Sequence, residues 1–179
     1  MNQMSHVFPA TTGSSPTYAP NLRESRVAVV CSSWHSDIVN ECKDALLAEF
    51  ERNDLPASQV DVFQVPGAFE IPLLSKRLAQ TGRYNAIVAC GLVVNGGIYR
   101  HEFVAAAVID GLMRVQLDSD VPVLSAVLTP RNFHEHEDHR RFFAEHLVKK
   151  GIEVAQACIQ TLINHRLFVA EERPQWPTT

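Results

Sequence analysis

Short apolar runs alternate with amphipathic segments through the central part of the chain. Four of these runs are predicted to be strands, namely Val27–Ser32, Val60–Val65, Ala86–Val93 and Val123–Leu128. Because most of them are apolar on both faces, or nearly so, they are typical of parallel strands that helices cover on both sides.

Helical periodicity follows each predicted strand. Ser36–Arg52 carries one apolar stripe at helical spacing, and a second stripe begins at Ile71 and continues through Leu74 to Leu78. The regular alternation of strand and helix predicts a three-layer α/β/α domain, with a four-stranded parallel sheet and right-handed crossover connections.

The helix predicted from about Arg100 to Leu117 has an unusual pattern. Apolar residues surround most of its circumference, and Asp110, Arg114 and Asp118 leave one narrow polar stripe. A helix that flanks a small sheet buries one face only. A second apolar face therefore predicts a second partner, namely another subunit. The alternative is a helix that is more buried than usual within its own chain.

The two ends of the chain lack this patterning. Residues 1–25, rich in Ser, Thr, Pro and Asn, are predicted to form a flexible N-terminal arm, and residues 169–179 a C-terminal tail. Residues 26–168 then form one α/β domain, in keeping with the total length of 179 residues.

Charge and composition exclude several classes of protein. The net charge of −4 provides no basic surface for nucleic acid or for an anionic membrane. No apolar run is long enough to span a bilayer, and the N-terminus lacks the basic and then apolar pattern of an export signal. Four widely spaced cysteines without a C-x-x-C motif are typical of buried thiols in a cytoplasmic protein, rather than of disulfides or metal ligands; they are Cys31, Cys42, Cys90 and Cys158.

Polar and aromatic residues gather where the predicted strands end. Ser33–His35 follow the first strand, Pro66–Glu70 the second, Asn95–His101 the third and Thr129–Phe133 the fourth. Because open parallel sheets bind ligands beyond the carboxyl ends of their strands, these loops are expected to form one site. Aromatic rings and a carboxylate suit a flat heterocycle that carries hydrogen-bond donors.

The glycine pair Gly96–Gly97 suits a phosphate. Bare backbone amides at the start of a helix can face an anion, and the helix dipole favours the negative charge. Each feature also has an ordinary structural explanation: the glycines could mark a plain turn, Trp34 could fill the core, and Glu70 could stabilise a helix N-terminus. Only the placement of these residues at one edge of the sheet favours the functional interpretation.

The run from His134 to His139 suggests a metal site, but its spacing disfavours one. No two of its histidines are four residues apart, the separation usual when one helix supplies two metal ligands. His139 with Arg140 and Arg141 instead offers a cationic cluster for a phosphate. No G-x-S-x-G or Walker motif occurs, and the lysines lie on charged helical stretches, which disfavours a Schiff-base enzyme.

Two motifs resemble those of the lumazine synthases, which catalyse the penultimate step of riboflavin biosynthesis. They are Val65–Pro72, with the sequence VPGAFEIP, and Gly91–Val104, with the sequence GLVVNGGIYRHEFV. The resemblance covers about Ser25 to Arg166. The sequence NGGIYRH at Asn95–His101 is similar to that of the type II branch of the family.

This resemblance implies a flavodoxin-like subunit that assembles into pentamers with active sites shared between neighbours, and type II members pair pentamers into decamers. The implied reaction condenses 5-amino-6-(D-ribitylamino)uracil with 3,4-dihydroxy-2-butanone 4-phosphate to 6,7-dimethyl-8-ribityllumazine, with release of phosphate and water. The resemblance implies that no cofactor and no metal are required. In the family the substrate's own amine forms the imine, which agrees with the lack of a suitable lysine in this chain. The implied partners are small-molecule substrates and copies of the same chain, without nucleic acid or membrane.

The family's site residues map onto this chain by position. Trp34 matches the aromatic residue that stacks on the pyrimidine, and Ser125 stands where many members place an aromatic residue from the adjacent subunit. A turn that binds the ring and the ribityl chain, and a backbone segment that reads the pyrimidine edge, match Ala68, Phe69, Glu70, Leu92, Val93 and Val94. The phosphate-binding positions are Gly96, Gly97, Ile98 and His139, the last in place of the usual arginine.

Arg100 departs from the family's pattern, which has a histidine proposed to shuttle protons at this position. The adjacent His101 cannot simply take over that role, because consecutive helical residues point about 100° apart. Arginine stays protonated near neutral pH, so Arg100 is expected to stabilise the phosphate and developing oxyanions, while protons move through water, substrate phosphate or His101. Two alternatives remain for the function of the protein: a weakly active or non-catalytic paralogue that binds lumazine-like or flavin-like ligands, and a general phosphosugar-binding protein. For Arg100 itself, the alternative is a surface ion pair with Asp138.

Overall fold

The computed structural model describes residues 22–95, 100–130 and 136–171. Within these ranges, strands and helices alternate from the first strand to the last helix. In chain order the elements are η1 (Leu22–Glu24), β1 (Val27–Ser32), α1 (Ser36–Arg52), η2 (Ala57–Gln59), β2 (Val60–Val65), η3 (Ala68–Glu70), α2 (Ile71–Gln80), β3 (Ala86–Leu92), α3 (His101–Ser119), β4 (Val123–Leu128) and α4 (Glu137–Glu171). The bounds of β1, α1, β2 and β4 are those predicted, whereas β3 ends one residue before the predicted Val93.

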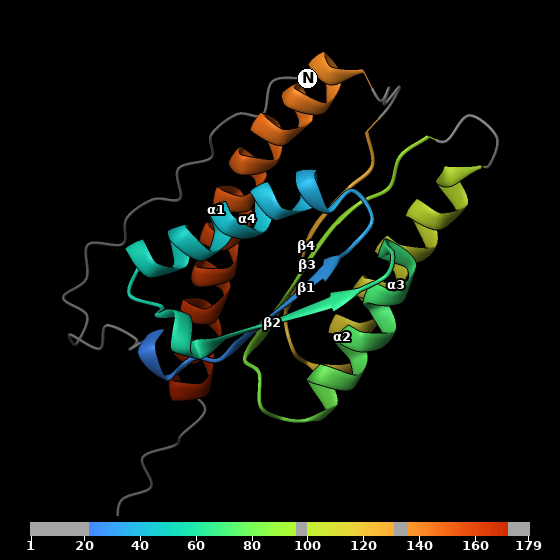
Figure 1. Cartoon of the computed structure of the whole chain (residues 1–179). Helices are drawn as coiled ribbons and strands as arrows, with labels where there is room; N and C mark the ends of the chain where they lie inside the picture. The colour runs from blue at the N-terminus through green and yellow to red at the C-terminus, as the bar shows by residue number, and fades with distance from the viewer. Residues whose placement is uncertain (1–21, 96–99, 131–135, 172–179) are drawn as a thin grey trace, which may run out of the picture.

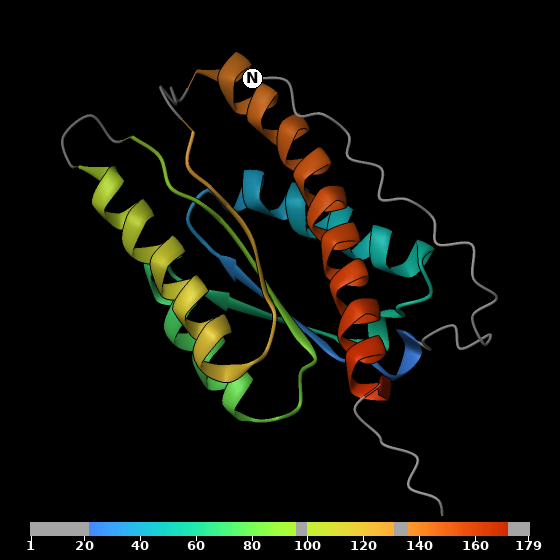
Figure 2. The same ribbon diagram turned by 180° about the vertical axis from the view of Figure 1, so that it is seen from behind.

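The strands form one sheet in the order β2-β1-β3-β4, and every neighbouring pair is parallel. The helices α1 and α4 cover one face of this sheet, and α2 and α3 cover the other, as Figure 1 and Figure 2 show from opposite sides. The predicted three-layer, flavodoxin-like α/β/α fold is therefore confirmed.

The central strand β1 shows how the sheet separates two cores. Val27, Val29 and Cys31 pack toward α1 and α4, whereas Ala28 and Val30 pack toward α2 and α3. All six residues of β1 are buried, as expected for a parallel strand covered on both faces. The prediction of buried thiols is also confirmed, because the structure buries as free cysteines Cys31, Cys42, Cys90 and Cys158.

Gly151 of α4 allows α1 and α4 to pack closely. A Cβ atom at this position would lie 2.3 Å from the backbone carbonyl oxygen of Cys42 in α1. A polar contact also joins the two helices, since Gln156 Nε2 donates a hydrogen bond to Glu49 Oε1 at 3.0 Å. This hydrogen bond is the main cause that holds the pKa of Glu49 below its usual range. The packing of α1 on α4 therefore combines a close steric fit with a specific polar contact.

The described structure extends into both predicted terminal segments. Leu22 packs against the core on the α1 and α4 side, and Ser25 is fully buried. These residues belong to the range predicted as an arm, while α4 continues to Glu171 and so enters the range predicted as a tail. None of the helices in the described ranges combines the length and the apolar character needed to cross a membrane.

A polar network joins the starts of three strands. Asp61 of β2 accepts hydrogen bonds from Arg26, which precedes β1, at 3.0 Å and from the Tyr84 hydroxyl, which precedes β3, at 2.7 Å. Arg83 also lies 3.7 Å from this carboxylate. The hydrogen bond from Tyr84, followed by that from Arg26, lowers the pKa of Asp61. Asp61 therefore stabilises the fold mainly in its ionised form.

We expect Asp61→Asn to lower the midpoint of urea unfolding at pH 7. A carboxyl group with a depressed pKa in the folded state stabilises the fold above its unfolded-state pKa of about 3.9, and this contribution is lost as the pH falls through the folded-state value. The difference between variant and wild type should therefore shrink below about pH 3.9. Asp54→Asn, in which the replaced side chain is 78% exposed, is the control and should unfold like wild type. A difference that stays constant in acid would contradict the role of Asp61.

Candidate active site

The carboxyl ends of the parallel strands meet at one rim of the sheet. In Figure 1 the N-terminal ends of α1, α3 and α4 lie at this same end of the molecule. The chain proceeds from β1 to one side of the sheet and from β3 to the other, so the order reverses between these two strands. Doubly wound sheets bind ligands at such a switch point. Trp34 follows β1 and Val94 follows β3, so these residues flank the switch point.

Trp34 lies against the loop that follows the neighbouring strand β2. Its backbone N–H donates a hydrogen bond to the Pro66 carbonyl at 3.1 Å, and the Ser33 N–H donates to the Val65 carbonyl at 2.8 Å. The indole ring rests on Gly67, where a Cβ atom would lie 2.8 Å from two ring carbons. Trp34 is nevertheless 67% exposed. This exposure rules out the alternative that Trp34 fills the core.

Glu70 and Phe69 belong to η3, the turn that follows Gly67. The Gly67 N–H donates a hydrogen bond to Glu70 Oε2 at 2.9 Å, so one carboxylate oxygen fixes the turn. Glu70 also directly precedes α2, which agrees with the structural role at a helix N-terminus. Both Phe69 and Glu70 are exposed, while Ala68 is buried. Gly67 contacts Trp34 as well as Glu70, so these side chains form one continuous surface.

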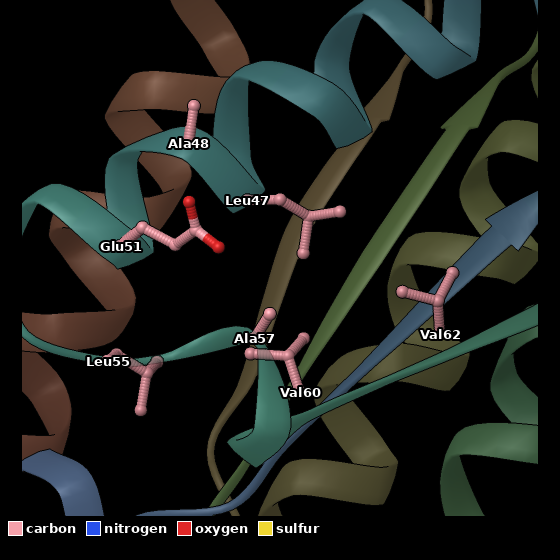
Figure 3. Close-up of a pocket in the computed structure, with 7 residues that line it drawn as sticks. All are labelled: Leu47, Ala48, Glu51, Leu55, Ala57, Val60 and Val62. Carbon is pink, nitrogen blue, oxygen red and sulfur yellow. The ribbon is translucent and has the colours of Figure 1, made fainter.

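A hollow of about 500 Å³ opens beside this surface, and its lining comprises Val65, Pro66, Phe69, Glu70, Leu73, Leu74 and Arg77. Another hollow, of about 340 Å³, lies between α1 and β2 (Figure 3), and its lining comprises Leu47, Ala48, Glu51, Leu55, Ala57, Val60 and Val62. The second hollow is at the start of β2, away from the rim where the strands end. The first hollow is therefore the one that belongs to the candidate site.

The end of β3 contributes mainly backbone. Leu92 and Val93 are buried, and Val94 is half-buried. The Val93 N–H donates a hydrogen bond to the Leu128 carbonyl of β4 at 2.9 Å, so a contact of Val93 with a ligand would involve its carbonyl oxygen. The predicted phosphate-binding residues that follow lie outside the described residues; they are Gly96, Gly97 and Ile98.

Arg100 directly precedes α3 and is exposed. Its guanidinium lies over the ring of Phe103, with Cζ 4.3 Å from the ring centre. The side chain of His101 is only 20% exposed, and its Nδ1 atom is 3.6 Å from the Glu102 carboxylate. The two adjacent basic residues therefore have different surroundings.

Ser125 does not lie with Trp34 within one chain. It pairs with Ala89 of β3, which in turn pairs with Val30 of β1. Ser125 is therefore level with the body of the sheet, on the edge strand β4, rather than beyond the strand ends. His139 belongs to the first turn of α4.

Two contacts at the rim were not predicted from the sequence. One is Gly67 as the surface on which Trp34 rests, and the other is Phe103 as the partner of Arg100. The local sequence does not indicate the contact of Gly67 with Trp34, because the two residues belong to different loops. It does indicate the contact of Phe103 with Arg100, because residues three positions apart share a face of a helix.

The rim defines a class of protein, namely a flavodoxin-like α/β protein with an exposed aromatic ring beside its switch point and a carboxylate in the loop that follows the neighbouring strand β2. The family model of 6,7-dimethyl-8-ribityllumazine synthase matches residues 24–166. A 6,7-dimethyl-8-ribityllumazine synthase of Rhodococcus erythropolis is 57% identical over 141 residues, which cover 79% of this chain and 91% of the relative. The 6,7-dimethyl-8-ribityllumazine synthase 2 of Bradyrhizobium diazoefficiens is 59% identical over 138 residues, which cover 77% and 82%. The chain belongs to the 6,7-dimethyl-8-ribityllumazine synthase family, whose members are transferases of riboflavin biosynthesis.

Proposed function

We propose that this chain condenses 5-amino-6-(D-ribitylamino)uracil with 3,4-dihydroxy-2-butanone 4-phosphate to form 6,7-dimethyl-8-ribityllumazine, and that it uses the rim of the sheet to do so. The observation that carries the proposal is the exposed Trp34 ring, which rests on Gly67 beside the Glu70 carboxylate. Membership of the family supports the choice of substrates.

The pyrimidine stacks on the Trp34 ring, because an exposed indole offers an apolar face to a flat heterocycle. Glu70 accepts hydrogen bonds from N–H or O–H groups of the same substrate through the carboxylate oxygen that does not bind Gly67. The turn at Ala68 and Phe69 and the backbone of 92–94 complete this half of the site. The phosphate of the second substrate binds near Arg100, with Gly96, Gly97, Ile98 and His139 as its further ligands.

The condensation begins when the primary amine of the pyrimidine attacks the ketone carbonyl, and the loss of water then gives the imine. The nucleophile therefore comes from the substrate, and the protein supplies binding, orientation and charge stabilisation. The Arg100 guanidinium stabilises the phosphate but cannot serve as a general base. Proton transfer consequently falls to water, to the substrate phosphate or to His101, and turnover is slow relative to relatives with histidine at this position.

The outer face of α3 supports assembly. Within the chain, α3 buries Val108, Leu112 and Val115, and it leaves Met113 52% and Leu117 71% exposed. This exposure contradicts the alternative of a helix buried by its own chain, and an apolar face of this kind packs against another subunit. The proposed assembly is a pentamer, paired as a decamer in the cytoplasm, in which Ser125 reaches the site of a neighbour.

The direct test is to incubate the full-length protein with both substrates and to follow the fluorescence of the lumazine product, together with the mass in solution. Product formation by an assembly larger than a monomer is the expected result. Binding of a ribityl-pyrimidine analogue without product would favour the non-catalytic paralogue. No affinity for that analogue would favour a general phosphosugar-binding protein.

We expect Arg100→Ala to raise KM for the butanone phosphate about tenfold and to leave KM for the pyrimidine nearly unchanged, because a charge-assisted contact to phosphate is lost. Steady-state kinetics with each substrate varied in turn measures both constants. Arg114→Ala is the matched control, since Arg114 lies on the same helix, is 83% exposed and pairs with Asp118. Equal effects of Arg100→Ala on both KM values would assign Arg100 a structural role instead.

A further inference from the structure

Arg100 and Phe103 are joined by two contacts in the first turn of α3. The guanidinium Cζ lies 4.3 Å from the centre of the Phe103 ring, within the range where a cation is attracted to an aromatic face. The Phe103 N–H also donates a hydrogen bond to the Arg100 carbonyl at 3.2 Å. The backbone turn therefore brings the ring to the cation.

Arg100 lies at a position where a cation is disfavoured unless another group stabilises it. It is the residue before His101, where α3 begins, and the positive end of a helix dipole disfavours a cation there. An arginine side chain also has many rotamers, and their loss opposes any single position. The Phe103 ring offsets both effects, because it attracts the guanidinium and confines it to one side of the helix.

Phe103 contributes little to the core of its own chain. It is 62% exposed, whereas the residues that α3 buries are Val108, Leu112 and Val115. Packing within the chain therefore does not require an aromatic side chain at position 103. The contact with the guanidinium, by contrast, requires an aromatic ring face.

We infer that Phe103 is a positioning residue whose ring holds the Arg100 guanidinium at the amino end of α3, where it binds the phosphate of the substrate. This inference rests on the proposed function of Arg100. A guanidinium that is ordered before the ligand arrives loses less freedom on binding, which increases affinity. Phe103 thus sets the affinity for phosphate without contacting the phosphate.

Calorimetric titration of the full-length protein with inorganic phosphate tests this inference independently of turnover. Phe103→Leu keeps an apolar side chain but removes the ring face, and we expect it to weaken phosphate binding about threefold. Phe103→Tyr keeps the ring face and should bind phosphate like wild type. Val62→Ala, at a position of β2 that is 44% exposed and lines the hollow away from the rim, controls for lost apolar surface and should leave phosphate affinity unchanged.

A double variant shows whether the ring acts through the arginine. In the Arg100→Ala background, Phe103→Leu should cause no further loss of phosphate affinity. The inference is overturned if wild type does not bind phosphate or if Arg100→Ala does not weaken phosphate binding. It is also overturned if Phe103→Leu binds phosphate like wild type, or if the full effect of Phe103→Leu persists in the Arg100→Ala background. When the expected phosphate pattern is found but both substrates give no lumazine, the proposed function fails while the inference stands.

Discussion

Gly151→Ala is expected to lower the free energy of unfolding by about 3 kcal/mol. Alanine inside a helix is normally about 1 kcal/mol more favourable than glycine, so the expected change is opposite in sign to helix propensity. The reason is the 2.3 Å separation between the added Cβ atom and the Cys42 carbonyl oxygen. A backbone atom cannot rotate away as a side chain can, so α1 and α4 must separate over a shared core.

Gly111→Ala provides a matched control within another helix pair. A Cβ atom at Gly111 of α3 would lie 3.0 Å from Pro72 Cβ of α2, a contact that a small shift relieves. We expect this variant to lose less than half as much stability as Gly151→Ala. Urea unfolding followed by circular dichroism measures both losses. A Gly151→Ala protein as stable as wild type would show that α1 and α4 do not pack as closely as described.

The bounds of several single elements could be predicted, but the contacts between elements could not. The strand Val27–Ser32 is an uninterrupted apolar run, and Ser36–Arg52 carries one clear stripe, so both have the bounds that the pattern predicts. From the local sequence alone, Gly151 would be expected only to destabilise its helix, because glycine has a low helix propensity. Its steric role depends on α1, which the sequence pattern does not place beside α4.

The candidate site was predictable to the extent that it depends on topology. Trp34 and Glu70 follow parallel strands that end at one rim, so their proximity follows from the alternation of strands and helices. Whether the indole fills the core or lies exposed depends on Gly67 in a different loop, and the sequence left both alternatives open. The position of Ser125 required the strand register, which places it away from Trp34 within one chain.

Trp34→Ala is expected to give the largest loss of ligand binding at this rim. We expect the affinity for a ribityl-pyrimidine analogue to fall by about 2 kcal/mol, roughly 30-fold in Kd, by analogy with the stacking of bases on aromatic side chains. Because Trp34 is 67% exposed, its truncation removes little core packing and should leave Tm nearly unchanged. Calorimetry and thermal unfolding measure the two effects. Affinity equal to that of wild type would remove Trp34 from the site.

Gly67→Ala changes the position of the Trp34 ring without removing the ring. The added Cβ atom would lie 2.8 Å from two ring carbons, so the indole must tilt although its chemistry is unchanged. We expect this variant to lose much of the affinity that Trp34→Ala loses, and the double variant to lose no more than Trp34→Ala alone, because both changes act through one ring. Trp34→Phe keeps a smaller ring at the same place and should lose less. If the losses of Gly67→Ala and Trp34→Ala are additive, Gly67 acts instead through its hydrogen bond to Glu70, and the carboxylate rather than the indole depends on this glycine.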